Sequence, residues 1–206
     1  MVGTFLEPDG GGENRGELLE LCAEAGNDLI VGNGFLFDGA MNEVAPNYPD
    51  LNFAITDGVA EPSNVRGMLF KHAEGSYLAG IAAALKTKTN NVGFIGGVDF
   101  PLIHEFEQGF LAGVAEINPD IVVQIGYASV PPDFSGFNDP VKGKEIALAQ
   151  YEAGADIIYH AAGGTGTGMF EAAKEVSEAT GSKVWGIGVD FDQYYQVGTP
   201  LPDLQE

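Results

Sequence analysis

Two aspartates stand directly after short apolar runs of the sequence, where a buried strand would end. Asp57 follows residues 53–56 (FAIT) and Asp190 follows residues 185–189 (WGIGV). An ionised carboxylate accepts two or more hydrogen bonds, each worth about 1.5 to 3 kcal/mol when charge-assisted, which suits the hydroxyl or N–H groups of a small ligand. The alternative for each aspartate alone is that it caps the next helix or turn.

Aromatic and polar residues occupy other expected strand ends. Phe35 comes shortly after residues 28–32 (DLIVG), and Tyr159 ends residues 156–159 (DIIY). Either ring is placed to stack on a planar ligand, a contact worth about 1 to 3 kcal/mol. Asn33 and Asp99 lie in equivalent loops and are further candidates. Core packing is the alternative for both aromatic residues.

The glycine-rich run at residues 163–168 (GGTGTG) follows an expected strand and opens an expected helix. Glycine lets backbone N–H groups approach a ligand, and the helix end adds about 0.3 to 1 kcal/mol per interacting charge. We therefore expect Gly163, Gly164 and Thr165 to contact a ligand. A tight turn between strand and helix explains the same spacing.

The known sequence motifs for catalysis, metal binding and cofactor binding are not matched in this chain. The glycine-rich run fits neither the dinucleotide fingerprint nor the lysine-bearing phosphate loop, and no G-x-S-x-G sequence occurs. His104 and Glu105 begin a zinc-protease pattern in which Gln108 replaces the second histidine. Cys22 is the only cysteine, which excludes an intrachain disulfide. We expect no enzyme activity, no metal and no cofactor, and a surface or helix-packing role for His104 and His160.

Composition narrows the ligand class. The chain has 206 residues with 30 acidic and 9 basic side chains, a net charge of -21. So acidic a chain disfavours nucleic acid and anionic membrane surfaces and favours a small neutral ligand. No apolar run approaches the roughly 20 residues that cross a bilayer. The first residues show no signal-peptide pattern, so the sequence predicts either a cytosolic protein or one whose start is missing.

Strand and helix signals alternate along the chain, which is typical of an α/β fold with parallel sheets and helices on their faces. Helical apolar stripes and short apolar runs at doubly wound spacing support this. The expected strands are residues 28–32, 53–56, 91–95, 121–125, 156–159 and 184–188, with a short one at residues 1–5. The expected helices are residues 13–25, 37–45, 73–85, 102–117, 141–153 and 169–179.

A polar stretch at residues 86–90 (KTKTN) indicates a boundary between two lobes. We expect an N-terminal lobe at residues 1–88 that lacks its first βα unit and a C-terminal lobe at residues 89–190. Residues 191–206 would begin a truncated return crossover. Each lobe would bind ligands at the carboxyl ends of its strands, with a shared cleft as the natural site.

Several stretches together resemble the basic membrane protein (PnrA-like) family of substrate-binding lipoproteins. Their order and distance along the chain are more specific than any one motif. They are residues 28–36 (DLIVGNGFL), 74–80 (EGSYLAG), 92–103 (VGFIGGVDFPLI), 154–166 (GADIIYHAAGGTG) and 188–193 (GVDFDQ).

The resemblance implies a type I periplasmic-binding-protein fold and an extracytoplasmic, lipid-anchored receptor that serves the permease subunits of an ABC transporter. It implies purine nucleosides as the ligand class. By position, Asp57 would match the carboxylate that contacts the base, Asp190 the one that holds ribose hydroxyls, and Tyr159 an aromatic that packs on the base. The family's opening strand, its lysine-serine-phenylalanine-asparagine stretch and a later lysine have no counterpart here.

Two other classes of protein are alternatives. One is an α/β enzyme that acts on a nucleotide or sugar through the glycine-rich loop, which would need a catalytic acid or base with a shifted pKa. The other is a regulatory ligand sensor with the same fold, which a DNA-binding helical segment would support.

Overall fold

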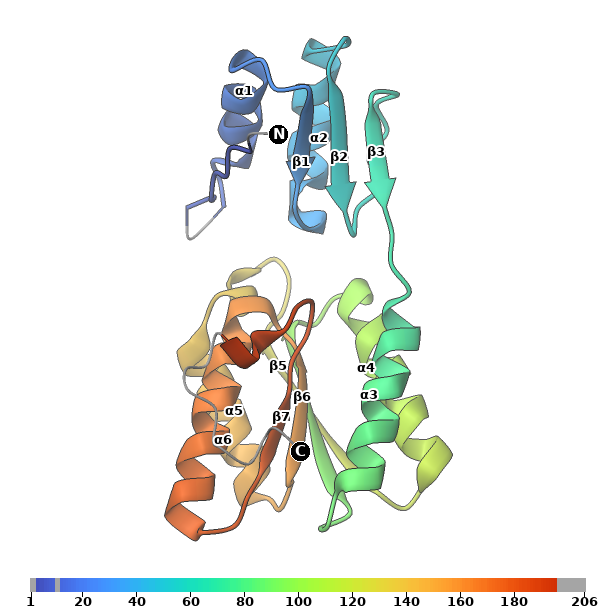
Figure 1. Ribbon diagram of the computed structural model, residues 1–206, viewed down its shortest axis with the longest axis vertical. Coiled ribbons are helices and arrows are strands. Elements are labelled where there is room, and N and C mark those ends of the chain that lie inside the picture. The colour runs from blue at the N-terminus through green and yellow to red at the C-terminus, as the bar shows by residue number, and fades with distance from the viewer. Residues whose placement is uncertain (1–2, 10–11, 196–206) are drawn as a thin grey trace. The chain divides into compact units, whose positions relative to one another are not determined.

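The computed structural model describes residues 3–9 and 12–195, and the chain divides into two compact units, Met1–Phe70 and Lys71–Glu206. Both units are α/β, and every strand pairing among these described residues is parallel, as expected from the alternation of elements. Figure 1 shows the strands and the helices that accompany them.

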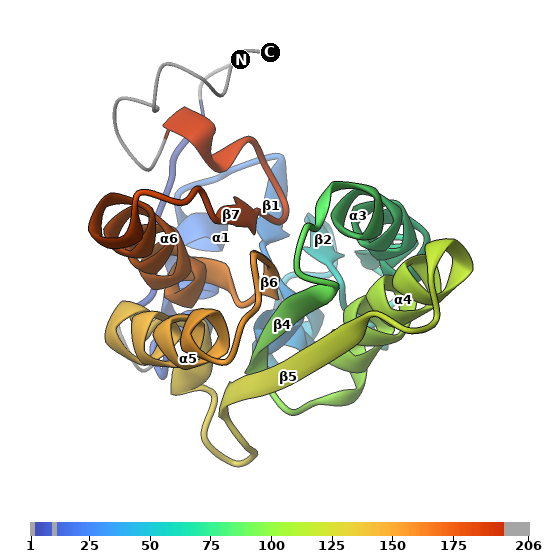
Figure 2. The ribbon, with the colours of Figure 1, turned by 90° about the horizontal axis from the view of Figure 1, so that it is seen from below.

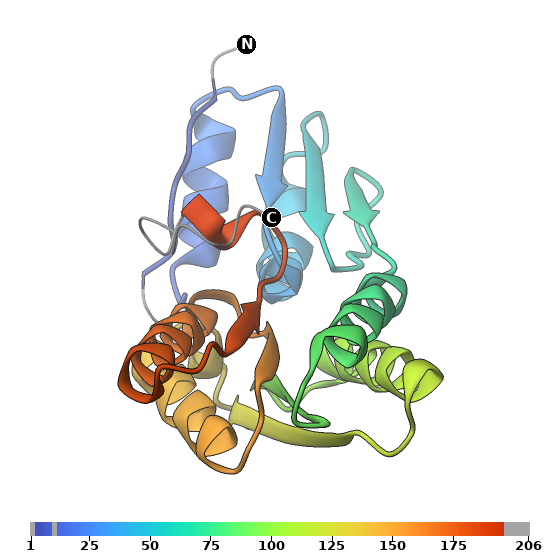
Figure 3. The same cartoon turned by 60° about the horizontal axis from the view of Figure 1, so that its bottom comes forward.

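The first unit is a three-stranded parallel sheet in the order β1-β2-β3, seen side by side in Figure 3. The strands are β1 (Leu29–Gly32), β2 (Asn52–Thr56) and β3 (Val65–Met68). The helices are α1 (Arg15–Glu24) and α2 (Asp38–Val44), with short 3-10 turns η1 (Phe35–Phe37) and η2 (Ala45–Asn47).

Apolar side chains from both helices and from the sheet form the core of the first unit. Met41 and Ile55 are fully buried in it, beside Phe53. Strand β1 alternates, with Ile30 in the core and the neighbouring Leu29 57% exposed. The sheet therefore buries the face on which α1 and α2 pack.

The second unit is a four-stranded parallel sheet in the order β5-β4-β6-β7. Its strands are β4 (Asn91–Val98), β5 (Val122–Ser129), β6 (Ile157–Ala161) and β7 (Trp185–Ile187). Its helices are α3 (His72–Lys86), α4 (Pro101–Ile117), α5 (Pro140–Glu152) and α6 (Gly166–Thr180), with 3-10 turns η3 (Ser135–Phe137), η4 (Gly163–Thr165) and η5 (Gln193–Tyr195).

Helices cover both faces of this second sheet. Figure 2 shows α3 and α4 on one face and α5 and α6 on the other. The core is correspondingly split, with Phe94 and Phe110 on the α3–α4 side and Ile95 and Ile158 on the α5–α6 side. Strands β4 and β6 are buried almost throughout, as parallel strands with two covered faces should be.

Helices α3 and α4 pack closely through glycines. A Cβ at Gly113 would overlap the carbonyl oxygen of Tyr77, and one at Gly109 would overlap that of Ala73. Backbone therefore lies against backbone at these positions. This packing places α3 in the second unit, so the division between units falls after Phe70 and not in the stretch 86–90, where the sequence had indicated it.

The polar stretch 86–90 is instead a loop within the second unit. The carboxylate of Asp156, which is 9% exposed, accepts hydrogen bonds from Thr87 Oγ1 at 2.6 Å, Lys88 N at 2.6 Å and Thr89 N at 3.3 Å. One buried carboxylate thus anchors the connection between α3 and β4. The stretch 86–90 is therefore polar because it binds this carboxylate, and it is not a linker between the units.

The expected elements are found with small shifts and two errors. Strand β3 was not predicted, and no strand exists among residues 3–5, where the sequence had indicated an opening strand; residues 1–2 lie outside the described part. Helix α6 begins at Gly166 and not at residue 169, and β5 continues to Ser129 because Tyr127 and Ser129 still pair with β4.

Trp185 begins β7 at the amino edge of the second sheet. The ammonium groups of Lys86 and Lys183 lie 4.4 Å and 4.2 Å from the centroid of its ring. Both distances are within the range of cation–π attraction. Two of the few cations of this acidic chain are therefore held against its only tryptophan.

Candidate ligand-binding site

The first unit brings three predicted site residues to the carboxyl edge of its sheet. Asn33 follows β1 and Asp57 follows β2, and these two strands are neighbours with Gly32 opposite Ile55. Thr56 Oγ1 donates to Asn33 Oδ1 at 2.9 Å and accepts from Gly34 N at 2.6 Å, which ties the two loops together. Phe35 begins the next turn and is half-buried.

Asp57 has a backbone conformation that is uncommon for a residue with a side chain. Its φ is 57°, in the left-handed region, and its N–H donates to Met68 O of β3 at 2.9 Å. Aspartate tolerates this region better than most residues, at a cost that the surrounding structure must offset. Such residues cluster at ligand-binding sites, and this one is half-buried at a strand end.

Asp190 repeats this arrangement in the second unit. It lies three residues beyond β7 with a φ of 67°, and its side chain is exposed. Phe191 N donates to Val189 O at 2.8 Å, which closes a tight three-residue turn around it. Turns of this kind with positive φ are rare and strained. Asn90 is the only other non-glycine residue of residues 3–9 and 12–195 with positive φ, and it precedes β4 at the opposite edge.

Tyr159 lies in the core of the second unit, as the alternative interpretation proposed. It is 4% exposed, its ring packs against those of Phe94 and Phe110, and its hydroxyl is 3.0 Å from Ser76 Oγ. Burial raises the pKa of Tyr159, the hydrogen bond with Ser76 lowers it, and the negative charge of Asp190 raises it further. The ring and hydroxyl of Tyr159 therefore belong to the core packing of the second unit.

The glycine-rich run is packed tightly against its own unit. Thr165 is fully buried, and its hydroxyl donates to Gly136 O at 2.7 Å and accepts from Asp139 N at 2.7 Å. A Cβ at Gly168 would overlap Pro140 O. These contacts explain Thr165 and Gly168 as parts of a strand-to-helix turn. Gly164 is exposed, and Gly163, with a φ of 53°, is partly exposed.

Asp99 follows β4 and pairs with a histidine of α4. Its Oδ1 lies 2.6 Å from Nε2 of His104, and about half of each side chain is exposed. The His104 ring lies edge-on to Tyr127, whose hydroxyl donates to Glu107. Burial, with Glu107 beside it, raises the pKa of Tyr127 strongly. His104 thus takes a surface role, as expected from sequence.

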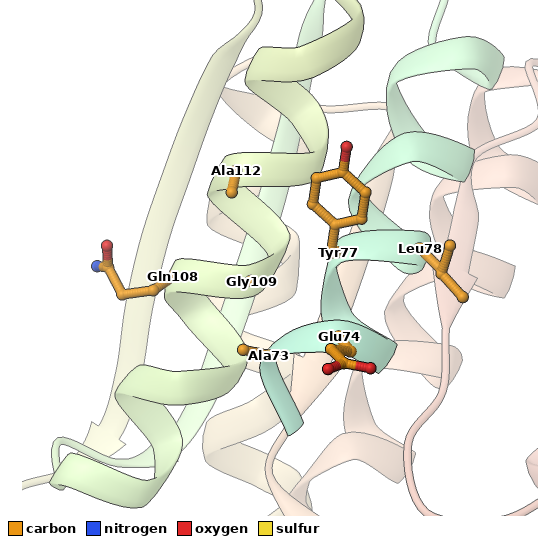
Figure 4. Close-up of a pocket in the computed structure, with 7 residues that line it drawn as sticks. All are labelled: Ala73, Glu74, Tyr77, Leu78, Gln108, Gly109 and Ala112. Atoms are coloured by element: carbon orange, nitrogen blue, oxygen red, sulfur yellow. The ribbon is translucent and has the colours of Figure 1, made fainter. Parts of the chain in front are cut away.

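One groove in the described part of the chain lies elsewhere, between α3 and α4 (Figure 4). It has a volume of about 560 Å³, and its lining includes Tyr77 and Leu78 of α3 and Gly109 and Ala112 of α4. None of the predicted site residues lines it. Within residues 3–9 and 12–195, no group of three or more histidine, cysteine or acidic side chains is arranged to hold a metal ion.

Sequence reasoning missed two buried polar residues near Asp190. His160 is fully buried on β6, where a helix-packing or surface role had been expected, and Gln193 is 5% exposed in η5. Their side chains are hydrogen-bonded, with His160 Nε2 2.9 Å from Gln193 Oε1. Gln193 is the last residue of one of the family-like stretches, residues 188–193, and this was the available signal.

The parallel α/β sheets with helices on their faces define a type I periplasmic-binding-protein fold, the class of many ABC-transporter solute-binding proteins. A solute-binding protein of an ABC transporter from Aeropyrum pernix K1 has a similar crystal structure. The TM-score is 0.76 at 31% identity, over 88% of this chain and 51% of that one. A sugar transporter from Clostridium phytofermentans, 15% identical with a TM-score of 0.62, shares the fold.

The chain belongs to the Bmp family, described as ABC transporter substrate-binding protein PnrA-like, whose model matches residues 7–199. The ABC transporter nucleoside-binding protein BmpA of Lactococcus lactis is 45% identical over 175 residues, 84% of this chain and 48% of that protein. Basic membrane protein A of Borreliella burgdorferi is 37% identical over 181 residues, 86% of this chain and 50% of that protein.

The resemblance identified from sequence is therefore confirmed, and the solute-binding class is favoured over an enzyme or a sensor. The chain spans about half the length of the curated relatives it matches. No helix in the described ranges is long and apolar enough to cross a membrane.

Proposed function

We propose that this chain binds a purine nucleoside and serves as the extracytoplasmic, lipid-anchored receptor component of an ABC transporter, without catalysing a reaction. The observation that carries the proposal is the pair of left-handed aspartates, Asp57 and Asp190, each at the carboxyl edge of a parallel sheet. Ligands of open α/β sheets bind at this edge.

The chemistry of these residues suits a neutral, hydroxyl-bearing ligand. Asp57 would accept from N–H groups of the base, and Asp190 from the ribose hydroxyls. Asn33, beside Asp57, adds an amide, and Phe35 adds a half-buried ring for stacking. Asp99 and the backbone of Gly163 and Gly164 are further contacts at the same edge of the second sheet. A net charge of -21 favours a nucleoside over its phosphate esters.

The name of the Lactococcus lactis relative, a nucleoside-binding protein, supports the ligand class. Binding in the micromolar range needs about -8 kcal/mol, which one stacked base and several charge-assisted hydrogen bonds supply after the cost of association. Permease subunits of the transporter are the expected protein partners.

Calorimetric titration with inosine, guanosine and adenosine tests the proposal, with ribose as a fourth titrant. Asp57→Asn and Asp190→Asn keep a side chain that tolerates the left-handed backbone and remove only the charge. We expect each to weaken binding roughly 10- to 100-fold, from the loss of about 1.5 to 3 kcal/mol.

The matched control is Asp120→Asn, an exposed aspartate in the turn before β5 at the opposite edge of the sheet. It removes the same charge and should leave the dissociation constant unchanged. Absence of heat with all three nucleosides would refute the nucleoside assignment.

A further inference from the structure

The side chain of His160 fills a space in the second unit that exists because residue 166 is a glycine. The side chain is fully buried on β6, and the ring of Phe170 meets it edge-on, with the centroids 5.5 Å apart. A Cβ at Gly166 would overlap the imidazole ring. Gly166 is therefore a packing partner of His160, and a larger residue there would displace the ring.

The hydrogen bonds of Gln193 fix its amide orientation and the tautomer of His160. The backbone N–H of Val189, which can only donate, lies 2.9 Å from Gln193 Oε1, so that atom is the oxygen of the amide. The same oxygen lies 2.9 Å from His160 Nε2. Since a carbonyl oxygen only accepts, His160 carries its proton on Nε2. Within the described ranges Nδ1 has no hydrogen-bond partner, which suits an unprotonated nitrogen.

Gln193 reaches back across the turn that carries Asp190. Gly188 makes this possible, because a Cβ there would meet the amide oxygen of Gln193. The oxygen therefore holds Val189, the residue directly before Asp190, while Val189 O accepts from Phe191 N on the other side. The left-handed backbone of Asp190 lies between two hydrogen-bonded neighbours.

We propose that His160 and Gln193 form a buried latch that holds the strained turn around Asp190 in its ligand-binding conformation. His160 donates to Gln193, and Gln193 in turn holds Val189, so both act as positioning residues and neither contacts the ligand. The role in binding rests on the proposed function of Asp190. A turn held ready before the ligand arrives avoids the cost of ordering it on binding.

The main test is Gln193→Met, which keeps the length of the side chain and removes its acceptor. The matched control is Gln150→Met. Gln150 is likewise 5% exposed in the second unit, but its side chain donates to Phe94 O, away from the Asp190 turn. Both variants should lower the melting temperature, so stability alone does not distinguish them.

Two measurements without ligand examine the latch itself. In the wild type, hydrogen exchange at the Val189 amide should be slow, and nitrogen shifts should show His160 protonated on Nε2. In Gln193→Met, Val189 should exchange at least tenfold faster, and the Asp190 carbon shifts should leave their left-handed values. Fast exchange in the wild type, or protonation on Nδ1, would overturn the latch.

Inosine binding then tests whether the latch contributes to ligand affinity. We expect Gln193→Met to raise the dissociation constant about tenfold and Gln150→Met to change it less than twofold. Unchanged affinity in Gln193→Met, despite a released Val189, would overturn the positioning role. If the wild type bound no inosine, the nucleoside proposal would fail, while the exchange, tautomer and carbon-shift results would still decide whether the latch holds the turn.

Discussion

Acidification should weaken the second unit through His160. Burial lowers the pKa of this imidazole from 6.5 to about 4, and the hydrogen bond with Gln193 offsets only part of that effect. In the unfolded chain the imidazole is exposed and keeps its ordinary pKa. As the pH falls through 6.5, the unfolded state therefore binds a proton before the folded state does, and stability is lost progressively down to about pH 4.

The size of the effect follows from the difference between the two pKa values. Each pKa unit corresponds to 1.36 kcal/mol, so a difference of about 2.5 units costs roughly 3 kcal/mol in total. Between pH 7 and pH 5 the expected loss is about 2 kcal/mol, because pH 5 lies about 1.5 units below the pKa of the unfolded state and each unit costs 1.36 kcal/mol. Carboxylates also titrate near this range, so the wild type alone does not isolate the histidine.

Urea unfolding of the wild type and of His160→Gln at pH 7, 6 and 5 separates the two contributions. Glutamine can still donate to Gln193 but does not titrate, so the variant should lack the histidine contribution and keep that of the carboxylates. We expect the stability difference between the two proteins to shrink by about 2 kcal/mol from pH 7 to pH 5. Parallel pH profiles would refute the placement of a neutral His160 in the interior.

Two further pairs of substitutions test how the second unit is built. Asp156→Ala removes the acceptor of three hydrogen bonds and should lower the free energy of unfolding in urea by about 2 to 4 kcal/mol. Thr87→Val removes only one of the donors and should cost about 1 kcal/mol. Equal losses would contradict the anchoring of the loop by the carboxylate. Gly113→Ala forces a methyl group into the backbone of α3 and should cost about 1 to 3 kcal/mol or more. Gly75→Ala, at an exposed position of α3 with nothing within 4 Å, should stabilise by about 0.5 to 1 kcal/mol. Two stabilising results would mean that α3 and α4 are not in backbone contact.

The expected elements were recovered where the apolar signal was continuous. Strands β4 and β6 are buried on both faces, so residues 92–95 and 157–159 are unbroken apolar runs in the sequence. Strand β3 was not predicted because Val65–Met68 is four residues long, contains an arginine and a glycine, and lies at an exposed edge of the sheet. Its formation depends on pairing with β2, which a local pattern does not show.

The candidate site was predictable only in part. Position after a strand identified Asp57 and Asp190, but their left-handed backbones depend on hydrogen bonds to Met68 and around Val189 that no residue pattern shows. The burial of Tyr159 and Thr165 could not be predicted from the sequence, because it results from tertiary packing and not from the residue type. The α3–α4 glycines explain why the unit division precedes α3.

The position of Trp185 has a practical consequence for any spectroscopic study. Because the single indole belongs to the second unit and two ammonium groups lie on it, its emission reports on that unit. A fluorescence melt would miss a separate transition in residues 1–70. Far-ultraviolet dichroism, which records the backbone of both units, should accompany every such melt, and a gap between the two midpoints would measure how independently the units fold.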